Sequence, residues 1–179
     1  MRSLFVFILC SCIACTRLTA QSLNAEDIRS QFIKDWERAK AYTIDYLNTM
    51  PADKYSFKAT DSIRSFAQQM LHLAQSNVNI IAPLAGAVNI FGSRILEDSK
   101  ATQTKDSVIY CVVASYDLVI NGLKKMNFTS LGEKVKLYNW EETKYAWLLK
   151  AFEHQTHHRG QTTIYIRLLG LHPPQERLF

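Results

Sequence analysis

Apolar residues recur every three or four positions over four stretches of the chain, a spacing typical of amphipathic helices. Between these stretches glycine and proline are sparse, and Pro51 ends the first of them. No stretch shows the alternation of apolar and polar residues that is typical of a strand. The predicted helices cover residues 27–50, residues 62 to about 81, a third segment from a cap at Thr104 or Asp106 to Leu123, and residues from about 141 to 169.

Four helices of this length can bury their apolar stripes only against one another. The pattern therefore predicts an all-α protein with the architecture of a four-helix bundle. The connection between the second and third helices, residues 82–103, is long. It has room for a short extra helix or for a lid over an active site.

The first twenty residues have the pattern of a secretory signal peptide rather than of a folded element. A basic start at Arg2 precedes an apolar run, residues 4–14, which is too short to span a bilayer comfortably, and Ala20 offers a small residue for cleavage. We predict a signal peptide over residues 1–20, a single domain over residues 21–179, and export to the periplasm. A lipid attached at Cys12 is the alternative, and no transmembrane span is expected in the mature chain.

Charge and cysteine content exclude several classes of function. The net charge of +5 falls by two when Arg2 and Arg17 leave with the signal peptide, and no block of basic residues remains. Nucleic-acid binding is therefore not expected. Three of the four cysteines lie in the predicted signal peptide, so an intramolecular disulfide is excluded after cleavage at Ala20. The remaining one, Cys111, lies in an apolar run and is predicted to be a buried side chain rather than a nucleophile.

The fourth predicted helix carries three of the five histidines within five residues. His154 and His158 are one helical turn apart, with Cβ atoms about 5–6 Å from each other, which suits two ligands of one transition-metal ion. His157 lies about 80–100° around the helix from them. The pair falls at the middle of one stripe, which is predicted to face inward: Trp147, Ala151, His154, His158, Gln161, Tyr165 and Leu169.

Two imidazoles need a third ligand to make a typical metal site, and His72 and His172 are the remaining histidines. His72 is the better candidate because a helix is a rigid support. Its face also carries polar residues, however, and points away from the stripe of Phe66 and Met70. The periodicity therefore leaves open whether His72 is solvated or lines a wet cleft walled by Gln69, Ser76 and Asn79.

The motif His154-x-x-His157-His158-Arg159-Gly160-Gln161, continuing through residues 165–170 to Pro173-Pro174, closely resembles the C-terminal motif of the DinB-like family. Residues 50–57 and 65–74 also resemble the family's region around its first ligand, so the similarity spans the mature chain. The resemblance implies a four-helix bundle that holds a divalent ion, often zinc or nickel, on His72, His154 and His158. Most relatives are cytoplasmic, whereas this chain carries a predicted export signal.

The resemblance implies a metal-dependent hydrolase or a thiol or group transferase, acting on a small molecule through an open coordination position. Such an ion lowers the pKa of bound water or binds a thiolate or carbonyl. No catalytic residue is assigned, and a homodimer is left open. The alternatives are a non-enzymatic metal-binding or damage-response module with a structural ion, and a metal-free helical binding protein. A fourth protein ligand, such as Glu153 or His172, would favour the structural ion.

Other polar residues near the motif are expected to have structural roles. His157 is predicted to be structural, or else to support a ligand from behind, and Tyr165 to pack in the stripe. Gln161 and Tyr165 lie where they can orient water or substrate. Arg159 is expected to pair with an acid on a neighbouring helix, and Gly160 to permit a close approach between helices.

Overall fold

The computed structural model describes residues 23–179, so the predicted signal peptide and the alternative lipid site at Cys12 lie outside the described residues. The long helices are α1 (Ala25–Thr49), α2 (Phe66–Ala85), α3 (Lys105–Lys125) and α4 (Lys144–Leu168). The strands are β1 (Lys134–Leu137) and β2 (Trp140–Thr143). Short 3-10 turns are η1 (Ala52–Lys54), η2 (Leu96–Asp98), η3 (Lys100–Gln103) and η4 (Phe128–Ser130).

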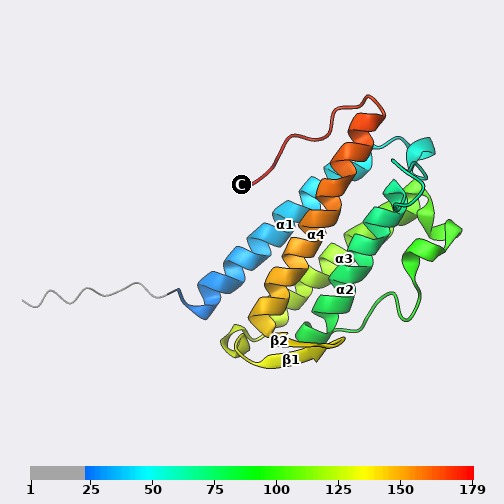
Figure 1. Cartoon of the computed structure of the whole chain (residues 1–179). Coiled ribbons are helices and arrows are strands. Elements are labelled where there is room, and N and C mark those ends of the chain that lie inside the picture. Colours follow the sequence, from blue (N-terminus) through cyan, green and yellow to red (C-terminus); the bar gives the residue numbers. More distant parts are fainter. Residues whose placement is uncertain (1–22) are drawn as a thin grey trace, which may run out of the picture.

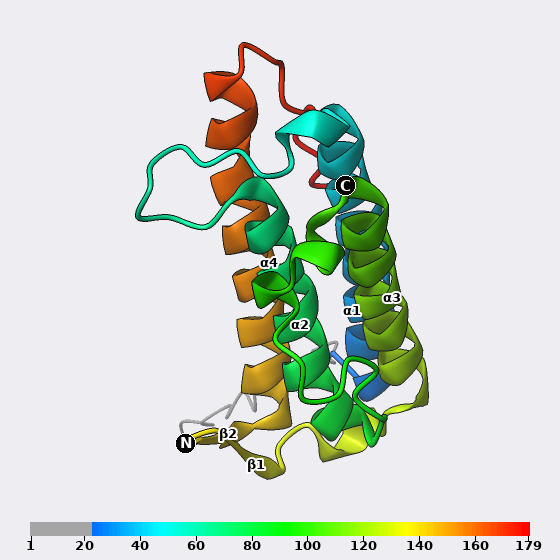
Figure 2. The same ribbon diagram turned by 90° about the vertical axis from the view of Figure 1, so that its right-hand side faces the viewer.

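The four long helices form a bundle in which α1 and α4 run in one direction and α2 and α3 in the other (Figure 1). Both α1 and α2 pack against α3 and α4, so α1 and α2 lie on a diagonal of the bundle. The connection between α2 and α3 is long because it returns along the bundle, from one end to the other (Figure 2). The predicted all-α four-helix bundle is confirmed.

Side-chain caps fix where each long helix begins. Asn24 and Ser65 each form a capping box with the third helical residue, at the starts of α1 and α2. Thr104 caps α3 and Thr143 caps α4, each by accepting a hydrogen bond from a backbone N–H in the first turn. Of the two caps predicted for the third helix, the structure uses Thr104. The helix predicted from residue 62 begins four residues later, at Phe66, after its cap at Ser65.

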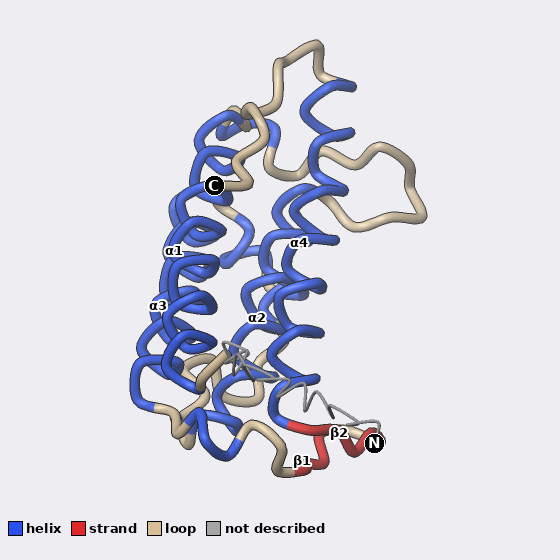
Figure 3. The backbone as a smooth tube through the Cα atoms, turned by 90° about the vertical axis from the view of Figure 1, so that its left-hand side faces the viewer, coloured by secondary structure: helices blue, strands red, loops and turns tan. Residues whose placement is uncertain are grey.

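A short β-hairpin precedes α4, where the sequence pattern predicted a helix from about Glu141. Residues 134–137 pair antiparallel with residues 140–143 and close one end of the bundle (Figure 3). Val135 and Leu137 are half-buried against the core, and Trp147 donates its indole N–H to the carbonyl of Val135, 2.9 Å away. Alternation of apolar and polar residues over only four positions cannot be distinguished from a loop in the sequence, because such a short strand is stabilised by its packing against the rest of the fold.

The core fills the space between the helices and explains the composition of α3. That helix is long and apolar enough to cross a membrane on length and composition alone, and half of its most apolar window is buried. Val108, Val112, Val119 and Leu123 are fully buried in the core that α3 shares with α1 and α2. Packing within the bundle therefore accounts for the apolar character of α3.

Candidate metal centre

Three imidazole rings meet between α2 and α4. The ring centroid of His72 lies 5.2 Å from that of His154 and 4.6 Å from that of His158, and the two rings on α4 are 4.4 Å apart. One ring nitrogen from each side chain lies within 4.8 Å of the other two. The three predicted ligands therefore converge, although His72 lies more than 80 positions before the two histidines of α4.

His72 reaches this cluster because the polar face of α2 packs against α4 instead of facing solvent. Gln69, on the same face, is 6% exposed, and its amide reaches His158 and the hydroxyl of Tyr165. Helix α2 has two packing neighbours, so its apolar stripe is not its only buried face. Hydrophobic periodicity left the position of His72 open because it detects apolar burial and is insensitive to a buried polar face.

Two of the three rings have their Nδ1 atoms fixed by hydrogen bonds. Nδ1 of His158 lies 2.7 Å from Oε1 of Gln69, and Nδ1 of His72 lies 3.2 Å from Oε1 of Glu97. Both partners are acceptors, so each ring donates from Nδ1 and its Nε2 atom carries the free lone pair. The Nδ1 atom of His154 is buried and has no hydrogen-bond partner among residues 23–179.

The environment keeps the cluster uncharged at neutral pH. Burial, followed by the charges of the neighbouring histidines, lowers the pKa of His158 to about 3 and that of His154 to about 4. Burial and the positive charge of Arg64 also lower the pKa of His72, against the opposing pull of Glu97. Neutral imidazoles are the form that binds metal ions.

Two charged residues from the connections on either side of α2 belong to the site, and the sequence pattern did not identify them. Glu97 lies in the η2 turn, beside His72, and Arg64 reaches it from the segment before α2. The guanidinium holds the carboxylate through two hydrogen bonds, Nε to Oε2 at 2.5 Å and Nη2 to Oε1 at 3.1 Å. Burial alone would raise the pKa of Glu97, but the hydrogen bond and charge of Arg64, with His72, bring it below its ordinary value.

A polar cleft of about 890 Å³ lies beside His158. It is lined by the segment before α2, the η2 turn and α4, including Lys58, Asp61, Arg64, Glu97, His157 and Gln161. The expectation of a cleft walled by Gln69, Ser76 and Asn79 is met only at Gln69. Asn79 instead accepts a hydrogen bond from Asn89 in the long connection, 2.9 Å away.

The polar residues around the histidine motif divide between the cleft and the bundle interior. His157 is exposed, and its Nε2 lies 2.8 Å from the amide nitrogen of Gln161, so these two side chains form part of the cleft rim. Tyr165 is buried; its hydroxyl donates to the carbonyl of Arg64 at 2.7 Å and accepts from Gln69. Tyr165 therefore packs in the bundle and also holds Gln69, a partner of His158, in place. The predicted inward stripe is only partly correct, since Gln161 is half-buried.

The prediction that Arg159 pairs with an acid is wrong. Its guanidinium is buried between α1 and α4, where it donates to Oε1 of Gln155 at 2.8 Å and lies 4.7 Å from the ring centroid of Tyr42. No carboxylate pairs with it within residues 23–179. An amide and an aromatic face therefore replace the expected acid.

The prediction for Gly160 is also wrong. It is exposed, and a Cβ atom added there would meet nothing within 4 Å. Close approach between helices occurs instead at Gly122 of α3, where an added Cβ atom would lie 2.9 Å from the Cβ of Ala85 on α2. The presence of a glycine in a helix does not reveal whether that face of the helix packs against another helix or faces solvent.

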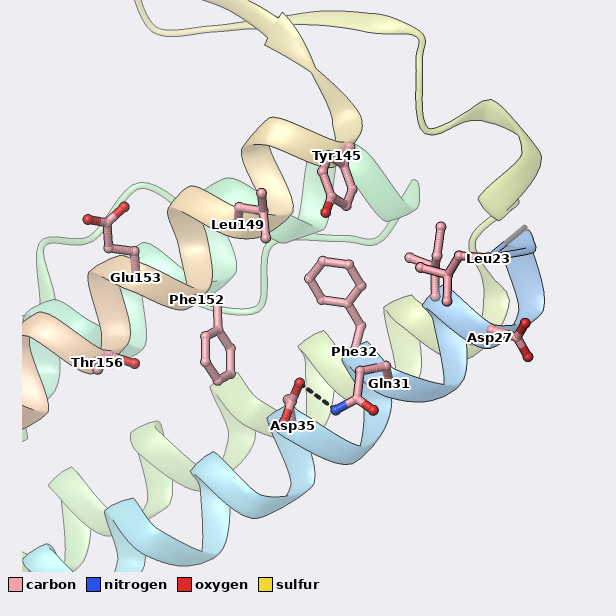
Figure 4. Close-up of a pocket in the computed structure, with 11 residues that line it drawn as sticks. Leu23, Asp27, Gln31, Phe32, Asp35, Tyr145, Leu149, Phe152, Glu153 and Thr156 are labelled. Atoms are coloured by element: carbon pink, nitrogen blue, oxygen red, sulfur yellow. Dashed lines mark hydrogen bonds between the residues drawn. The ribbon is translucent and has the colours of Figure 1, made fainter. Parts of the chain in front are cut away.

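Neither candidate for a fourth ligand joins the three histidines. Glu153 lines a separate cavity of about 750 Å³ between α1 and α4, whose walls include Phe32 and Phe152 (Figure 4). His172 is exposed in the segment that follows α4. In the part of the chain that the structure describes, the group of potential ligands holds only His72, His154 and His158. Cys111 is buried away from them and, because burial raises its pKa, stays a thiol.

The fold has clear counterparts among solved structures. A DinB-like protein from Bacillus cereus superimposes with a TM-score of 0.69 at 17% identity, over 82% of this chain and 96% of the other. A conserved protein from Enterococcus faecalis gives 0.66 at 17% identity, over 80% and 98%. A DinB-like protein from Bacillus subtilis gives 0.61 at 18% identity, over 83% and 96%. At these identities the likeness establishes the fold alone.

Comparison with models of known protein families shows which family the chain belongs to. Residues 15–177, most of the chain, match the DinB family. Among curated protein sequences, none matches the chain. The family match, the fold and the converging histidines agree with one another. The chain belongs to the DinB family.

Proposed function

We propose that this protein binds a divalent metal ion, zinc or nickel, through His72, His154 and His158, and uses it in hydrolysis or in thiol or group transfer on a small molecule. The observation that carries the proposal is the convergence of three neutral imidazoles, without a fourth ligand among residues 23–179, beside a polar cleft. Catalytic zinc sites combine three protein ligands with one open position, whereas structural sites are closed by a fourth.

The donor set suits such an ion. Two rings have Nδ1 engaged by oxygen acceptors, which directs their Nε2 lone pairs to a ligand role. The third ring, His154, has a buried Nδ1 without a partner, and an unpaired buried nitrogen costs free energy that coordination would recover. All-imidazole sites favour zinc, copper, iron and nickel over magnesium and calcium, which prefer oxygen ligands.

When bound, the ion acts as a Lewis acid toward a water molecule, a carbonyl oxygen or a thiol of the substrate. The protein's own residues position the reaction. Gln69 and Glu97 hold two of the imidazole rings in fixed orientations. At the cleft rim, His157 is exposed and lies where it can take or give a proton, and Gln161 orients it by a hydrogen bond.

The cleft fits a small molecule rather than a polymer. Its volume of about 890 Å³ falls in the usual range for small-molecule sites, which is about 300–1,000 Å³. Its walls carry acids and bases together, so a polar substrate with both donor and acceptor groups suits it. With the predicted export signal, we propose a periplasmic location, and hence a substrate or acceptor thiol that is present outside the cytosol.

Metal content and turnover together test this function. Purified protein is stripped with a chelator, reloaded with zinc or nickel, and measured for metal stoichiometry and for activity on ester, amide and thiol-acceptor substrates. We expect one ion per chain, and turnover that a chelator abolishes. No metal uptake would reject the site itself. Stoichiometric uptake with a fully protein-coordinated ion and no turnover would favour the non-enzymatic metal-binding module.

A further inference from the structure

Among the three histidines, His72 differs from the other two in the charge of its hydrogen-bond partner. Its Nδ1 lies 3.2 Å from a carboxylate oxygen of Glu97, whereas the partner of His158 is the neutral amide of Gln69. A carboxylate behind a metal-ligating imidazole fixes the orientation of the ring and makes its other nitrogen a stronger donor. Glu97 is the one carboxylate in ion-pair distance of the cluster within residues 23–179.

The carboxylate of Glu97 is itself held in place. Arg64 binds both of its oxygens, and the Glu97 side chain is 14% exposed. The backbone of the turn is anchored as well, because the carbonyl of Glu97 accepts hydrogen bonds from the amides of Gln68 and Gln103. Oε1 of Gln75 accepts from the N–H of Leu96, the preceding residue. Glu97 is therefore a fixed group and not a surface side chain that meets His72 by chance.

Arg64 connects this carboxylate to the second supported ring. Its guanidinium holds Glu97, which contacts His72, and its carbonyl accepts from the hydroxyl of Tyr165. Tyr165 in turn accepts from Gln69, whose oxygen contacts His158. Two hydrogen-bonded chains thus run from Arg64 to two of the three rings. One passes through Glu97 in the η2 turn to His72, and the other passes through Tyr165 and Gln69 to His158.

We propose that Glu97 is a positioning residue for the metal centre: its carboxylate, fixed by Arg64, orients His72 and strengthens that ring as a ligand. The inference rests on the proposed function, since it assumes that the three histidines bind an ion. It gives the long connection between α2 and α3 a role in the site, through the η2 turn that carries Glu97. A positioning residue supports a ligand without entering the coordination shell.

Zinc affinity of matched variants tests the role of Glu97. Glu97→Gln removes the charge at nearly constant size. Asp98→Asn makes the same change at the next residue, which is exposed on the same cleft and forms no ion pair with a histidine among residues 23–179. Dissociation constants come from competition with a chromophoric zinc chelator. We expect Glu97→Gln to weaken binding about 10–100-fold and Asp98→Asn to leave it unchanged.

Two further measurements separate positioning from other roles. If Glu97 only stabilised the loop, its loss would lower the melting temperature of the metal-free protein and leave zinc affinity intact, which would overturn the proposal. If Glu97 were a ligand, Glu97→Gln would bind zinc as poorly as His72→Ala, which would overturn it too. Glu97→Asp, which keeps the charge but withdraws it from His72, is expected to weaken zinc binding and serves if Glu97→Gln fails to fold.

The outcome for Glu97 is distinguishable from the outcome for the proposed function. Unaltered protein that takes up no zinc would reject the metal site and, with it, the positioning role. Unaltered protein that binds zinc tightly, with Glu97→Gln equally tight, would reject the positioning role alone. The cobalt(II) absorption spectrum of Glu97→Gln gives a second readout, because a reoriented His72 alters the bands of a site that still holds its ion.

Discussion

The Nδ1 atom of His158 lies 2.7 Å from the Oε1 atom of Gln69, and this contact joins the two helices that build the candidate site. The amide nitrogen of Gln69 donates to the hydroxyl of Tyr165, so its oxygen is the atom left to accept from His158. That arrangement fixes the tautomer of His158 and leaves Nε2 with a free lone pair. A glutamine on the polar face of α2 thereby decides which nitrogen of a histidine on α4 can bind an ion.

Removing this acceptor is expected to weaken metal binding. Gln69→Leu keeps a side chain of similar size but cannot accept from Nδ1 of His158, so we expect zinc affinity to fall about tenfold or more. Gln69→Glu keeps an acceptor and is expected to retain binding. Isothermal titration with zinc compares the two variants. Equal affinity of Gln69→Leu and unaltered protein would show that the contact does not orient a ligand.

The two neighbouring histidines on α4 should respond differently to substitution. His158→Ala removes a buried ring of the converging cluster and is expected to abolish stoichiometric zinc uptake, because two imidazoles seldom hold an ion alone. His157→Ala removes an exposed ring at the cleft rim and is expected to retain most of the uptake. Elemental analysis after dialysis measures both. The reverse order would contradict the choice of ligands.

Stability of the metal-free protein should fall as the pH drops below neutral. Burial, followed by the charges of neighbouring histidines, lowers the pKa of His154 from 6.5 to about 4 and that of His158 to about 3 in the folded protein. Between pH 7 and pH 5 the unfolded chain therefore binds more protons at these rings than the folded protein does, and folding weakens as the pH falls.

Urea titrations in the presence of a chelator, at pH 7 and pH 5, measure this effect. The control is the double variant His154→Gln/His158→Gln, in which both groups are absent and other titrating groups are unchanged. The urea midpoint of the unaltered protein should drop more between the two pH values than that of the double variant. Equal drops would show that the two rings are not buried in the neutral form.

Two helical glycines should respond in opposite ways to alanine. A methyl group at Gly122 would lie 2.9 Å from the Cβ of Ala85, so Gly122→Ala is expected to lower the free energy of unfolding by about 1–3 kcal/mol. At Gly160 the added methyl meets nothing, and Gly160→Ala is expected to stabilise α4 by about 0.5–1 kcal/mol. Urea denaturation measures both, and destabilisation by Gly160→Ala would contradict the packing described for α4.

Much of the fold and two of the three candidate ligands could be predicted because the relevant signals are local in the sequence. Caps and breaks mark the ends of the helices, as Thr104 and Pro51 illustrate, and the apolar stripes predict that the helices pack together. The pairing of His154 with His158 follows from the geometry of a single helical turn. Residue spacing alone was enough to place these two rings side by side.

The position of His72 could not be decided in this way. Its place in the site depends on which helix covers the polar face of α2, and that depends on the packing order of the bundle. Resemblance to a family supplied the expectation, and the convergence of the three rings agrees with it. The short hairpin over residues 134–143 could not be predicted for a similar reason. Its strands are stabilised by packing of their apolar side chains against the core, which the sequence pattern does not show.

The sequence by itself determined four amphipathic helices and two histidines on one face of the last, because these follow from hydrogen bonding and spacing within one segment. Only the tertiary structure decided that His72 faces α4, that Gln69 and Glu97 support two of the rings, and that Arg159 is buried without an acid. These contacts join residues that are far apart in the chain. Their formation depends on the packing of helices against one another, which no local pattern of residues encodes.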